Sequence, residues 1–536
     1  MKTPNSIPVD RESGIRLKDG DRSDTAEIVI IGAGPGGLAT AMLLAYAGHS
    51  VRIIERLPFA GGRTSSFGGN GFKFDLGPTF FLYPQILEGI FRAVGRRLED
   101  EVDMRRVDPQ YRIHFGDTGE SILCVPDMVE MQKTIATIAP ADAANLPRYL
   151  ADNRKKLEAL TPVIQSPSAG FKDYFTIAKL LTVLRPWSSL EDELRKYFAD
   201  RRIRRAFSFQ SKYVGMSPYN CPSMFSILSF LEYETGVHHP IGGCAAVTQA
   251  MARVALQLGV RMHLGEDVEA IQFEGKRAVG VKTTRGEYPC DALVINADFA
   301  NAMRRLVPNE MRSKWSNEKL DKKKYSCSTF MMYLGIEGHY RDVAHHTVYI
   351  PDDYEQNLHD IEDGNVLSED PSFYLQNAGI TDPTLAPKGH SGLYVLVPVT
   401  NSTENVDWTK QWAPFRKKMM KHLEKIGVTD LERRIRYERV ITPREWAHGY
   451  RIERGAVFNL AHTLGQLLQF RPNNRFEELD GVYLVGGGTH PGSGLPVIFE
   501  SARISSRLIL EDRGEDTKWI DESAAPVAID KLLKVA

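Results

Sequence analysis

Three glycines and one carboxylate near the start of the chain have the spacing of a dinucleotide-binding site. Gly32, Gly34 and Gly37 form a Gly-x-Gly-x-x-Gly pattern, and Glu55 follows about 20 residues later, where a ribose-binding carboxylate is found in such sites. The first glycine permits a tight turn, the second lets the backbone approach a pyrophosphate, and the third lets a helix pack closely on a strand. The pattern predicts a dinucleotide site, and a turn that binds nothing is the alternative.

A second set of residues suited to a phosphate follows directly. Residues 61–64 read Gly-Gly-Arg-Thr; the glycines permit a backbone turn beneath a bulky ligand, and the guanidinium offers several N–H donors to a pyrophosphate. An exposed glycine loop is the alternative interpretation. The candidate contact residues in this part of the chain are Arg56, Gly61, Gly62, Arg63, Thr64, Pro78 and Thr79.

A third glycine-rich stretch, GGGTHPGSGLPVIFESARIS, lies near the other end of the chain at 486–505. Pro496 occupies the place of a first helical residue, and the helix N-terminus after this turn can direct partial positive charge at a ligand. His490 lies inside the turn, where an imidazole can exchange a proton near neutral pH. A packing role for His490 is the alternative.

Strands and helices of a buried parallel sheet must position the first of these motifs. We expect a strand at 27–31, a helix at 35–47 and a strand at 51–55, because apolar strands followed by apolar helices belong to a parallel sheet covered on both faces. Residues 28–51 contain no Asp, Glu, Lys or Arg, as a membrane span would, but the glycines between 32 and 37 argue against a spanning helix.

The late motif has the same construction. Residues 480–488 read as a buried strand, and a helix is expected over 497–510. Between the two motifs, residues 260–298 read as a series of short alternating strands.

Composition and charge exclude several classes of function. The chain has 536 residues, of which 42% are hydrophobic and 25% charged, as in a globular protein long enough for more than one domain. The formal net charge of −1 argues against a nucleic-acid partner. The five cysteines are widely spaced, without Cys-x-x-Cys, so neither a metal site nor a disulfide framework is predicted. The first 25 residues are expected to be a flexible tail, not a signal peptide.

Taken together, the motifs resemble a family of flavoproteins. The succession Gly-x-Gly-x-x-Gly-Leu, Glu-Arg, Gly-Gly-Arg and Asp-x-Gly-Pro-Thr is similar to the FAD-binding start of the amine oxidase and phytoene desaturase flavoproteins. The late stretch resembles the C-terminal motif of bacterial-type phytoene desaturases, including their C30 diapophytoene branch. At 494–497 and 500–503 the chain departs from the C40 pattern toward the C30 branch. The resemblance extends from about residue 26 to 512, with further similar segments at 236–271, 293–308, 372–399 and 457–475.

This resemblance implies an α/β fold with a Rossmann-type FAD-binding domain, interleaved with a mixed α+β substrate domain and a helical membrane-facing region. The implied division is a tail at 1–25, a discontinuous FAD-binding domain at 26–100, 236–310 and 470–515, a substrate and membrane-facing domain at 101–235 and 311–469, and a C-terminal extension at 516–536.

FAD is the cofactor that the resemblance implies, and no metal is implied. Val268 would meet the adenine through its backbone. His490 is the first candidate for a catalytic acid or base, ahead of Glu500, His238 and His239. The residues expected to contact FAD are Gly32, Gly34, Pro35, Gly36, Gly37, Glu55, Arg56, Gly61, Gly62, Arg63, Thr64, Pro78, Thr79, Val268, Asp298, Gly487, Gly488, Gly494, Leu495, Pro496 and Val497.

The implied activity is desaturation of an acyclic C30 or C40 polyene precursor, of the phytoene or 4,4′-diapophytoene type, in carotenoid biosynthesis. Because each buried CH₂ is worth about 0.8 kcal/mol, such a hydrocarbon must come from a lipid bilayer. We therefore expect a cytoplasmic protein associated peripherally with the membrane surface. The candidate contact regions are the amphipathic segment 171–187, the basic cluster 201–205 and the apolar run 224–233, and packing on the core is the alternative for each.

The sequence contains no second dinucleotide motif, so oxygen or a quinone is expected to accept the electrons. Other functions remain open: a carotenoid isomerase, a terminal-methyl oxygenase or oxidase or a saturase-type reductase on the same scaffold, a soluble amine or porphyrinogen oxidase, and a non-catalytic carrier of prenyl lipids. Substrate length and oligomeric state are also left open.

Overall fold

The computed structural model describes residues 25–167, 184–185, 187–401 and 405–523. Almost all of the predicted tail at 1–25, most of the segment 171–187 and residues 524–536 of the predicted extension lie outside the described residues. The described part of that extension forms helix α19 (Lys518–Glu522), whose Ile520 is buried against the first lobe of the protein.

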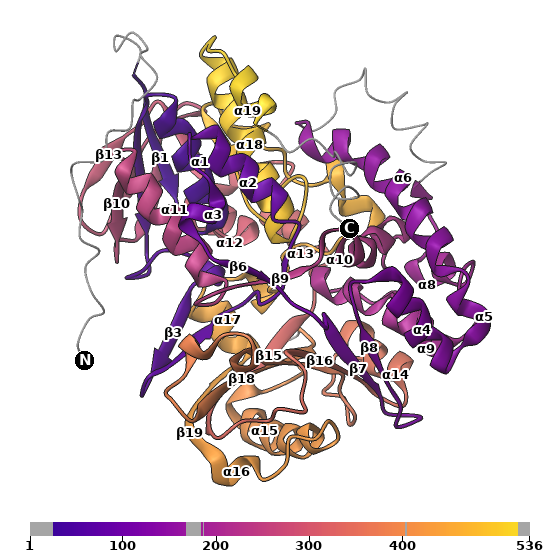
Figure 1. Ribbon diagram of the computed structural model, residues 1–536. Coiled ribbons are helices and arrows are strands. Elements are labelled where there is room, and N and C mark those ends of the chain that lie inside the picture. Colours follow the sequence, from indigo (N-terminus) through magenta and orange to yellow (C-terminus); the bar gives the residue numbers. More distant parts are fainter. Residues whose placement is uncertain (1–24, 168–183, 186, 402–404, 524–536) are drawn as a thin grey trace.

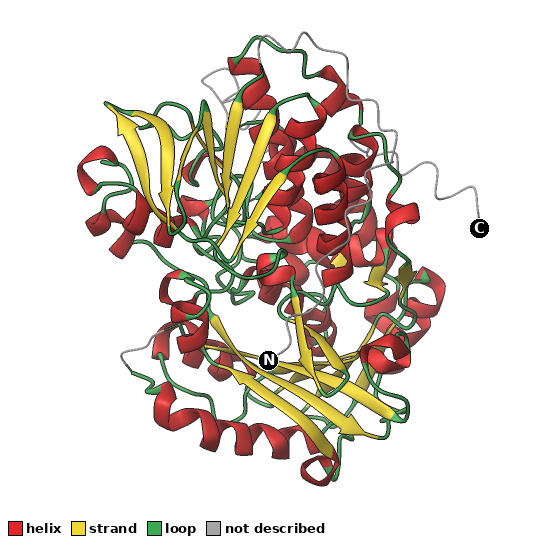
Figure 2. Cartoon of the chain, turned by 90° about the vertical axis from the view of Figure 1, so that its left-hand side faces the viewer, coloured by secondary structure: helices red, strands yellow, loops and turns green. Residues whose placement is uncertain are grey.

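A five-stranded parallel sheet forms the centre of the first lobe (Figures 1 and 2). Its strands come from three distant parts of the chain. In spatial order they are β10 (Arg261–Leu264), β2 (Ser50–Glu55), β1 (Glu27–Ile31), β14 (Ala292–Ile295) and β20 (Val482–Leu484).

Both faces of this sheet are covered, which explains its apolar strands. Ile28 and Ile30 pack in the core that contains helices α1 (Pro35–Tyr46), α11 (Ala245–Gln257) and α18 (Leu495–Asp512). Val29 and Ile31 point to the opposite core, which contains α12 (Phe299–Leu306). The predicted strand–helix–strand unit at the start of the chain and the predicted late strand and helix are confirmed.

A small antiparallel sheet lies against that second face. It consists of β11 (Val268–Glu274), β12 (Arg277–Thr283) and β13 (Glu287–Pro289), placed in the chain between β10 and β14. This arrangement confirms the succession of short strands expected at 260–298.

The second lobe is built on a seven-stranded mixed sheet (Figure 2). Helix α15 (Trp408–Glu424) packs on one face through Trp408, Phe415 and Met419. The other face turns Met331, Tyr333 and Tyr394 toward the first lobe's hairpin β3–β4 (Ser66–Gly69 and Phe72–Asp75). The strands are β19 (Ile435–Ile441), β15 (Ser328–Glu337), β18 (His390–Val399), β17 (Phe373–Asn377), β16 (His346–Ile350), β7 (Tyr111–Phe115) and β8 (Ser121–Cys124).

Helices complete the second lobe on the side of β7 and β8 (Figure 1). They pack around a core rich in aromatic side chains, in which Phe198 stacks on Phe207 and Tyr149 meets both rings at an angle. The helices include α4 (Met128–Ile138), α6 (Leu146–Gln165), α8 (Leu190–Leu194), α9 (Arg201–Ala206), the 3₁₀ turns η4 (Phe209–Val214) and η5 (Ser223–Ser226), and α10 (Ile227–Thr235).

Two of the three predicted membrane-contact regions take a different role. The basic cluster 201–205 lies in α9, where Arg202, Arg204 and Arg205 form ion pairs with carboxylates of the protein itself. The apolar run 224–233 is not an exposed surface; most of its side chains are buried. Both regions therefore pack within the second lobe: the arginines pair with carboxylates, and the apolar side chains are buried. Within the described ranges, no helix combines the length and apolar character needed to cross a bilayer.

Candidate cofactor and substrate cavity

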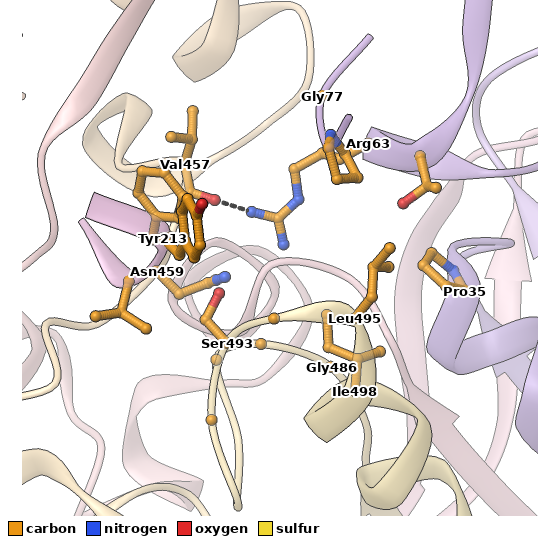
Figure 3. A pocket seen from close by; sticks show the side chains of 18 of the residues that line it. Pro35, Arg63, Gly77, Tyr213, Val457, Asn459, Gly486, Ser493, Leu495 and Ile498 are labelled. Carbon is orange, nitrogen blue, oxygen red and sulfur yellow. Dashed lines mark hydrogen bonds between the residues drawn. The ribbon is translucent and has the colours of Figure 1, made fainter. Parts of the chain in front are cut away.

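A cavity of about 560 Å³ lies between the two lobes and is lined by residues of both. One part of its lining consists of glycine-rich turns at the ends of the parallel strands (Figure 3). We call this part the glycine-turn wall and define it as Gly32, Gly34, Pro35, Gly36, Gly62, Gly486, Gly487, Gly488 and Gly494.

The first turn leaves no room for side chains. A Cβ atom on Gly37 would lie 2.2 Å from the carbonyl oxygen of Gly32, and one on Gly36 would lie 2.6 Å from Val485. Gly32 has a φ of 102°, which favours glycine. The turn therefore places backbone atoms, not side chains, at the cavity surface, as close approach of a pyrophosphate requires.

Glu55 ends β2 beside this turn and is held by the backbone. Its two carboxylate oxygens accept hydrogen bonds from the N–H groups of Ala33 (2.9 Å) and Leu57 (2.7 Å). Burial raises the pKa of Glu55, and these two hydrogen bonds oppose that rise. Each oxygen keeps a further lone pair for a hydroxyl donor from a ligand in the cavity.

Arg63 crosses the cavity toward the second lobe. Its Nη1 donates to the carbonyl oxygen of Val457 (Figure 3). With its amide oriented to satisfy both neighbours, Asn459 accepts from Nη2 of Arg63 (3.2 Å) and donates to Oδ2 of Asp298 (2.7 Å). Burial raises the pKa of Asp298 to about 6, and the charge of Arg63 opposes this rise. The guanidinium, amide and carboxyl thus form one linked polar group at the cofactor end of the cavity.

The helices α1 and α18 both begin at the cavity. Gly34 and Gly494 are their N-cap residues, and neither cap supplies a side-chain hydrogen bond to the first turn. Two helix N-termini of uncompensated partial positive charge therefore face the same space. This arrangement suits a ligand with negative charge at both ends, such as a pyrophosphate at one end and a flavin pyrimidine edge at the other.

Most residues expected to contact FAD line this cavity. Within the described chain, Gly37 and Gly61 do not line it: the first packs the turn from behind, and the second donates its N–H to Ala33 (2.8 Å). The predicted residues that line the cavity are Gly32, Gly34, Pro35, Gly36, Glu55, Arg56, Gly62, Arg63, Thr64, Pro78, Thr79, Val268, Asp298, Gly487, Gly488, Gly494, Leu495, Pro496 and Val497.

The candidates for a catalytic acid or base do not reach the cavity. His490 is 1% exposed, and its Nε2 donates to the carbonyl oxygen of Ser166 (3.0 Å). Glu500 is paired with Arg503 (2.6 Å), and His239 is paired with Asp382 (3.1 Å). His238, on β9 (Val237–Pro240), is likewise absent from the cavity lining. The assignment of His490 is therefore corrected to a packing role, because its turn directs the imidazole into the protein.

Sequence reasoning missed several polar residues of the site. Asn296 follows β14 and donates to the carbonyl oxygen of Gly32 (3.1 Å), which fixes the first turn. His462 lines the cavity and accepts from the N–H of Ser493 (3.1 Å); burial lowers its pKa. Arg451 forms a bidentate pair with Asp267 (2.7 and 2.8 Å) beside the cavity. A polar residue directly after a buried parallel strand was a usable signal for Asn296, whereas the other residues lie in loops.

Most of the remaining cavity lining is apolar. Helices α2 (Gln85–Ala93), α6 and α10 supply aliphatic side chains, and the seven-stranded sheet supplies Met331, Val348, Tyr374 and Leu396. We call the helical part the helical wall and define it as Ile86, Leu157, Leu160, Ile164, Ile227, Leu228 and Leu231. Such a surface binds hydrocarbon by excluding water and offers it no polar partner.

The glycine cradle, the carboxylate of Glu55, the guanidinium of Arg63 and the two helix N-termini fit FAD, whose parts require these contacts in this order. The chain has the mixed α/β fold of flavin-dependent oxidoreductases, and the family of flavin containing amine oxidoreductases matches residues 35–510. The chain belongs to this family and is an oxidoreductase with FAD as its cofactor.

Individual relatives within this family share much of their sequence with this chain. The chain is 40% identical to a 4,4′-diapophytoene desaturase (4,4′-diapolycopene-forming) of Methylomonas sp., over 94% of this chain and 98% of the relative. It is also 40% identical to an all-trans-zeta-carotene desaturase of Myxococcus xanthus, over 91% and 94% of the two chains. Among solved structures, an oxidoreductase from Methanosarcina mazei has a similar fold, with a TM-score of 0.62, 19% identity and coverage of 89% and 98%.

Proposed function

We propose that this protein is an FAD-dependent carotenoid desaturase that introduces C=C bonds into an acyclic C30 or C40 polyene precursor. The observation that carries the proposal is a single cavity in which a cofactor-binding part, the glycine-turn wall, continues into the apolar helical wall. The names of the relatives from Methylomonas and Myxococcus support the same reaction class.

When bound, FAD supplies an acceptor for the hydride that leaves an alkyl carbon of the substrate. The protein must hold the polyene against the cofactor and keep water away. Leu157, Leu160 and Leu231 supply apolar surface for the chain, and none of them offers a hydrogen bond. Alignment then comes from shape, since a hydrocarbon has no polar group by which it can be oriented.

The length of the substrate is proposed as either C30 or C40. The sequence departures at 494–497 favour the C30 branch, yet the two relatives at 40% identity are named for a C30 and a C40 substrate respectively. The helical wall is the part of the cavity that would select between them, because it can limit how far a chain extends.

We further propose that the protein works as a peripheral protein on the cytoplasmic face of a membrane, takes the precursor from the bilayer and passes electrons to oxygen or a quinone. Leu467 and Leu468 line the cavity, and the neighbouring Leu464 and Phe470 are about half exposed at the surface. An apolar surface beside an apolar cavity supports transfer from lipid.

The test is anaerobic bleaching of the flavin absorbance. Purified protein loaded with FAD is mixed with liposomes that carry either 4,4′-diapophytoene or phytoene. We expect bleaching together with new polyene bands at longer wavelength, and the faster precursor identifies the branch. Absence of bleaching with both precursors, in protein that holds FAD, contradicts the proposal and favours an isomerase or a terminal-methyl oxygenase acting on a later carotenoid.

A further inference from the structure

A buried carboxylate lies directly behind the cavity lining. Glu232, on α10, is 0% exposed and accepts three hydrogen bonds, from the hydroxyls of Tyr111 (2.8 Å) and Tyr213 (2.8 Å) and from Nε2 of Gln210 (2.9 Å). Of these three donors, Tyr213 is the one that lines the cavity. In Figure 3 Tyr213 appears on the same side of the view as Val457 and Asn459, opposite Pro35. Tyr213 therefore links the cavity to the carboxylate of Glu232 through one hydrogen bond.

The surroundings of Glu232 supply hydrogen bonds but no counter-charge. The titratable groups that face it are Tyr111 and Tyr213 with their hydroxyls, Tyr149 on α6, Tyr233 on its own helix and Cys124 on β8. No cation forms an ion pair with Glu232 in the described part of the chain. Burial raises the pKa of Glu232 to about 7, and the three hydrogen bonds oppose this rise.

This arrangement is more than packing requires. A buried ionised carboxylate without a cation is destabilising, whereas a neutral amide of the same shape could replace it, with its oxygen accepting from Tyr111 and Gln210 and its NH₂ donating to the hydroxyl of Tyr213. A carboxylate that exchanges a proton near neutral pH is instead what a general base needs. The other carboxylates that line the cavity, Glu55, Glu266, Asp267 and Asp298, lie at its cofactor end and are already bound by backbone N–H groups, hydroxyls or arginines.

We propose that Tyr213 accepts the proton that desaturation removes from the substrate, and that Glu232 takes up the phenolic proton in the same step. The inference rests on the proposed desaturase function. Tyr213 would be the catalytic residue that touches the substrate, and Glu232 a positioning residue that acts through it. Phe80 and Phe209 pack around the phenol ring, with ring centroids 5.4 and 5.9 Å away, so that the hydroxyl works in an apolar environment.

The step balances as follows. FAD, when bound, would supply the two-electron oxidant of the proposed function, which takes a hydride from one carbon of the substrate and leaves the substrate as an allylic cation. The neighbouring carbon then gives its proton to Oη of Tyr213, and the electron pair of that C–H bond becomes the new π bond. At the same time the original phenolic proton moves along the existing 2.8 Å hydrogen bond to Oε1 of Glu232. Once the product has left, the phenolic proton returns from Glu232 to Oη of Tyr213, and the proton taken from the substrate passes from Oη to water that enters the emptied cavity.

The test compares Tyr213→Phe and Glu232→Gln with the wild-type protein in the anaerobic bleaching experiment. Both variants should retain FAD, and both should bleach about 10²-fold more slowly, the lower range for loss of a general base. In the wild-type protein the bleaching rate should rise with pH through about 7, because Glu232 must be ionised to take up a proton. In Glu232→Gln this rise should be absent.

Tyr149→Phe is the matched control. Tyr149 is also a fully buried tyrosine, whose hydroxyl donates to the carbonyl oxygen of Ser226 in η5 and shares a hydrogen bond with the hydroxyl of Ser229 in α10, but it does not line the cavity. It should bleach at the wild-type rate. An infrared titration without substrate gives an independent readout: a protonated-carboxyl band should appear as the pH falls through about 7 in the wild-type protein and be missing in Glu232→Gln.

The outcomes separate this inference from the function on which it rests. If the wild-type protein bleaches and Tyr213→Phe bleaches equally fast with the same pH profile, the proton-transfer inference is overturned and the desaturase function stands. If the wild-type protein bleaches with neither precursor, both fall. If a variant loses its FAD, the wild-type data decide, since a bleaching rate that is constant for about one pH unit on either side of 7, or a missing infrared band, overturns the inference.

Discussion

The glycine-turn wall and the helical wall enclose the same cavity but depend on opposite features. The glycine-turn wall works through side chains that are absent: a Cβ added at Gly36 or Gly488 of this wall, or at Gly37 directly behind it, would lie 2.8 Å or less from a neighbouring atom. The helical wall works through side chains that are present, supplied by α2, α6 and α10. Changes to the first should therefore act on cofactor binding in an all-or-none way, whereas changes to the second should alter substrate choice by degrees.

The largest effect is expected at Gly37. In Gly37→Ala, the new Cβ would lie 2.2 Å from the carbonyl oxygen of Gly32, a backbone atom of the turn itself. The turn must open to admit it, which moves Gly34 away from a pyrophosphate. We expect the purified variant to lack FAD, measured as the ratio of flavin to protein absorbance.

Gly286→Ala serves as the control, because a Cβ there meets no atom within 4 Å. This variant should retain FAD in full. A Gly37→Ala protein that retains FAD like the control would show that the first turn tolerates displacement, and the proposed contrast between the two walls would then fail.

Arg63 should give the next largest effect, confined to the cofactor. A lysine in Arg63→Lys keeps the charge but cannot reach both the carbonyl oxygen of Val457 and the amide of Asn459. Loss of one charge-assisted hydrogen bond is worth about 1.5–3 kcal/mol, so the Kd for FAD should rise about 10- to 100-fold. Fluorescence titration of apoprotein with FAD measures it. Arg52→Lys, at an arginine that does not line the cavity, should leave this Kd unchanged.

The same contrast explains what the sequence could predict. Glycine-turn residues follow one another in short motifs after apolar strands, so their spacing in the chain already reflects their spacing in space. β1, α1 and β2 accordingly form where the pattern places them. Asn459 lies in a loop that is far from Arg63 in the sequence, and only the folded structure brings the two side chains into contact.

No short sequence motif marked the residues of the helical wall. The apolar run 224–233 was a candidate for membrane contact, with packing on the core as the alternative, and it is mostly buried and lines the cavity through residues such as Leu228 and Leu231. An apolar helical face has the same periodicity whether lipid, a core or a hydrocarbon ligand covers it. The prediction of a catalytic role for His490 was wrong for a related reason. Its position in a ligand-facing turn did not determine the direction of its ring, which points into the protein.

A graded effect is expected when the helical wall is filled. Leu228→Trp adds volume to a cavity-lining position on α10. Overpacking costs about 1–3 kcal/mol. Because a longer substrate needs more of the cavity, the lost space should weaken its binding more, so kcat/KM for phytoene should fall about tenfold relative to that for 4,4′-diapophytoene. FAD content should stay at the wild-type level. Leu228→Met, a volume-conserving change, should keep the wild-type preference, and an equal loss with both substrates would mean that Leu228 does not limit chain length.

The smallest effect concerns the charge at the cofactor end. Burial raises the pKa of Asp298 to about 6, so the folded protein holds this proton at pH values where the unfolded chain has lost it. The resulting contribution to stability is fully present below about pH 4 and is lost as the pH rises through about 6.

Asp298→Asn removes the charge, while an asparagine can keep the N-cap hydrogen bond from the N–H of Asn301. The melting temperature of the apoprotein variant, minus that of the wild-type protein, should therefore increase by about 1–3 °C between pH 4 and 6 and then level off. A difference that decreases over this range would mean that the charge of Arg63 outweighs burial and holds the carboxylate ionised. The attraction between the charges of Asp298 and Arg63 would then stabilise the cofactor end of the cavity in the apoprotein. The glycine-turn wall and the helical wall would in that case differ in shape but not in the cost of burying charge.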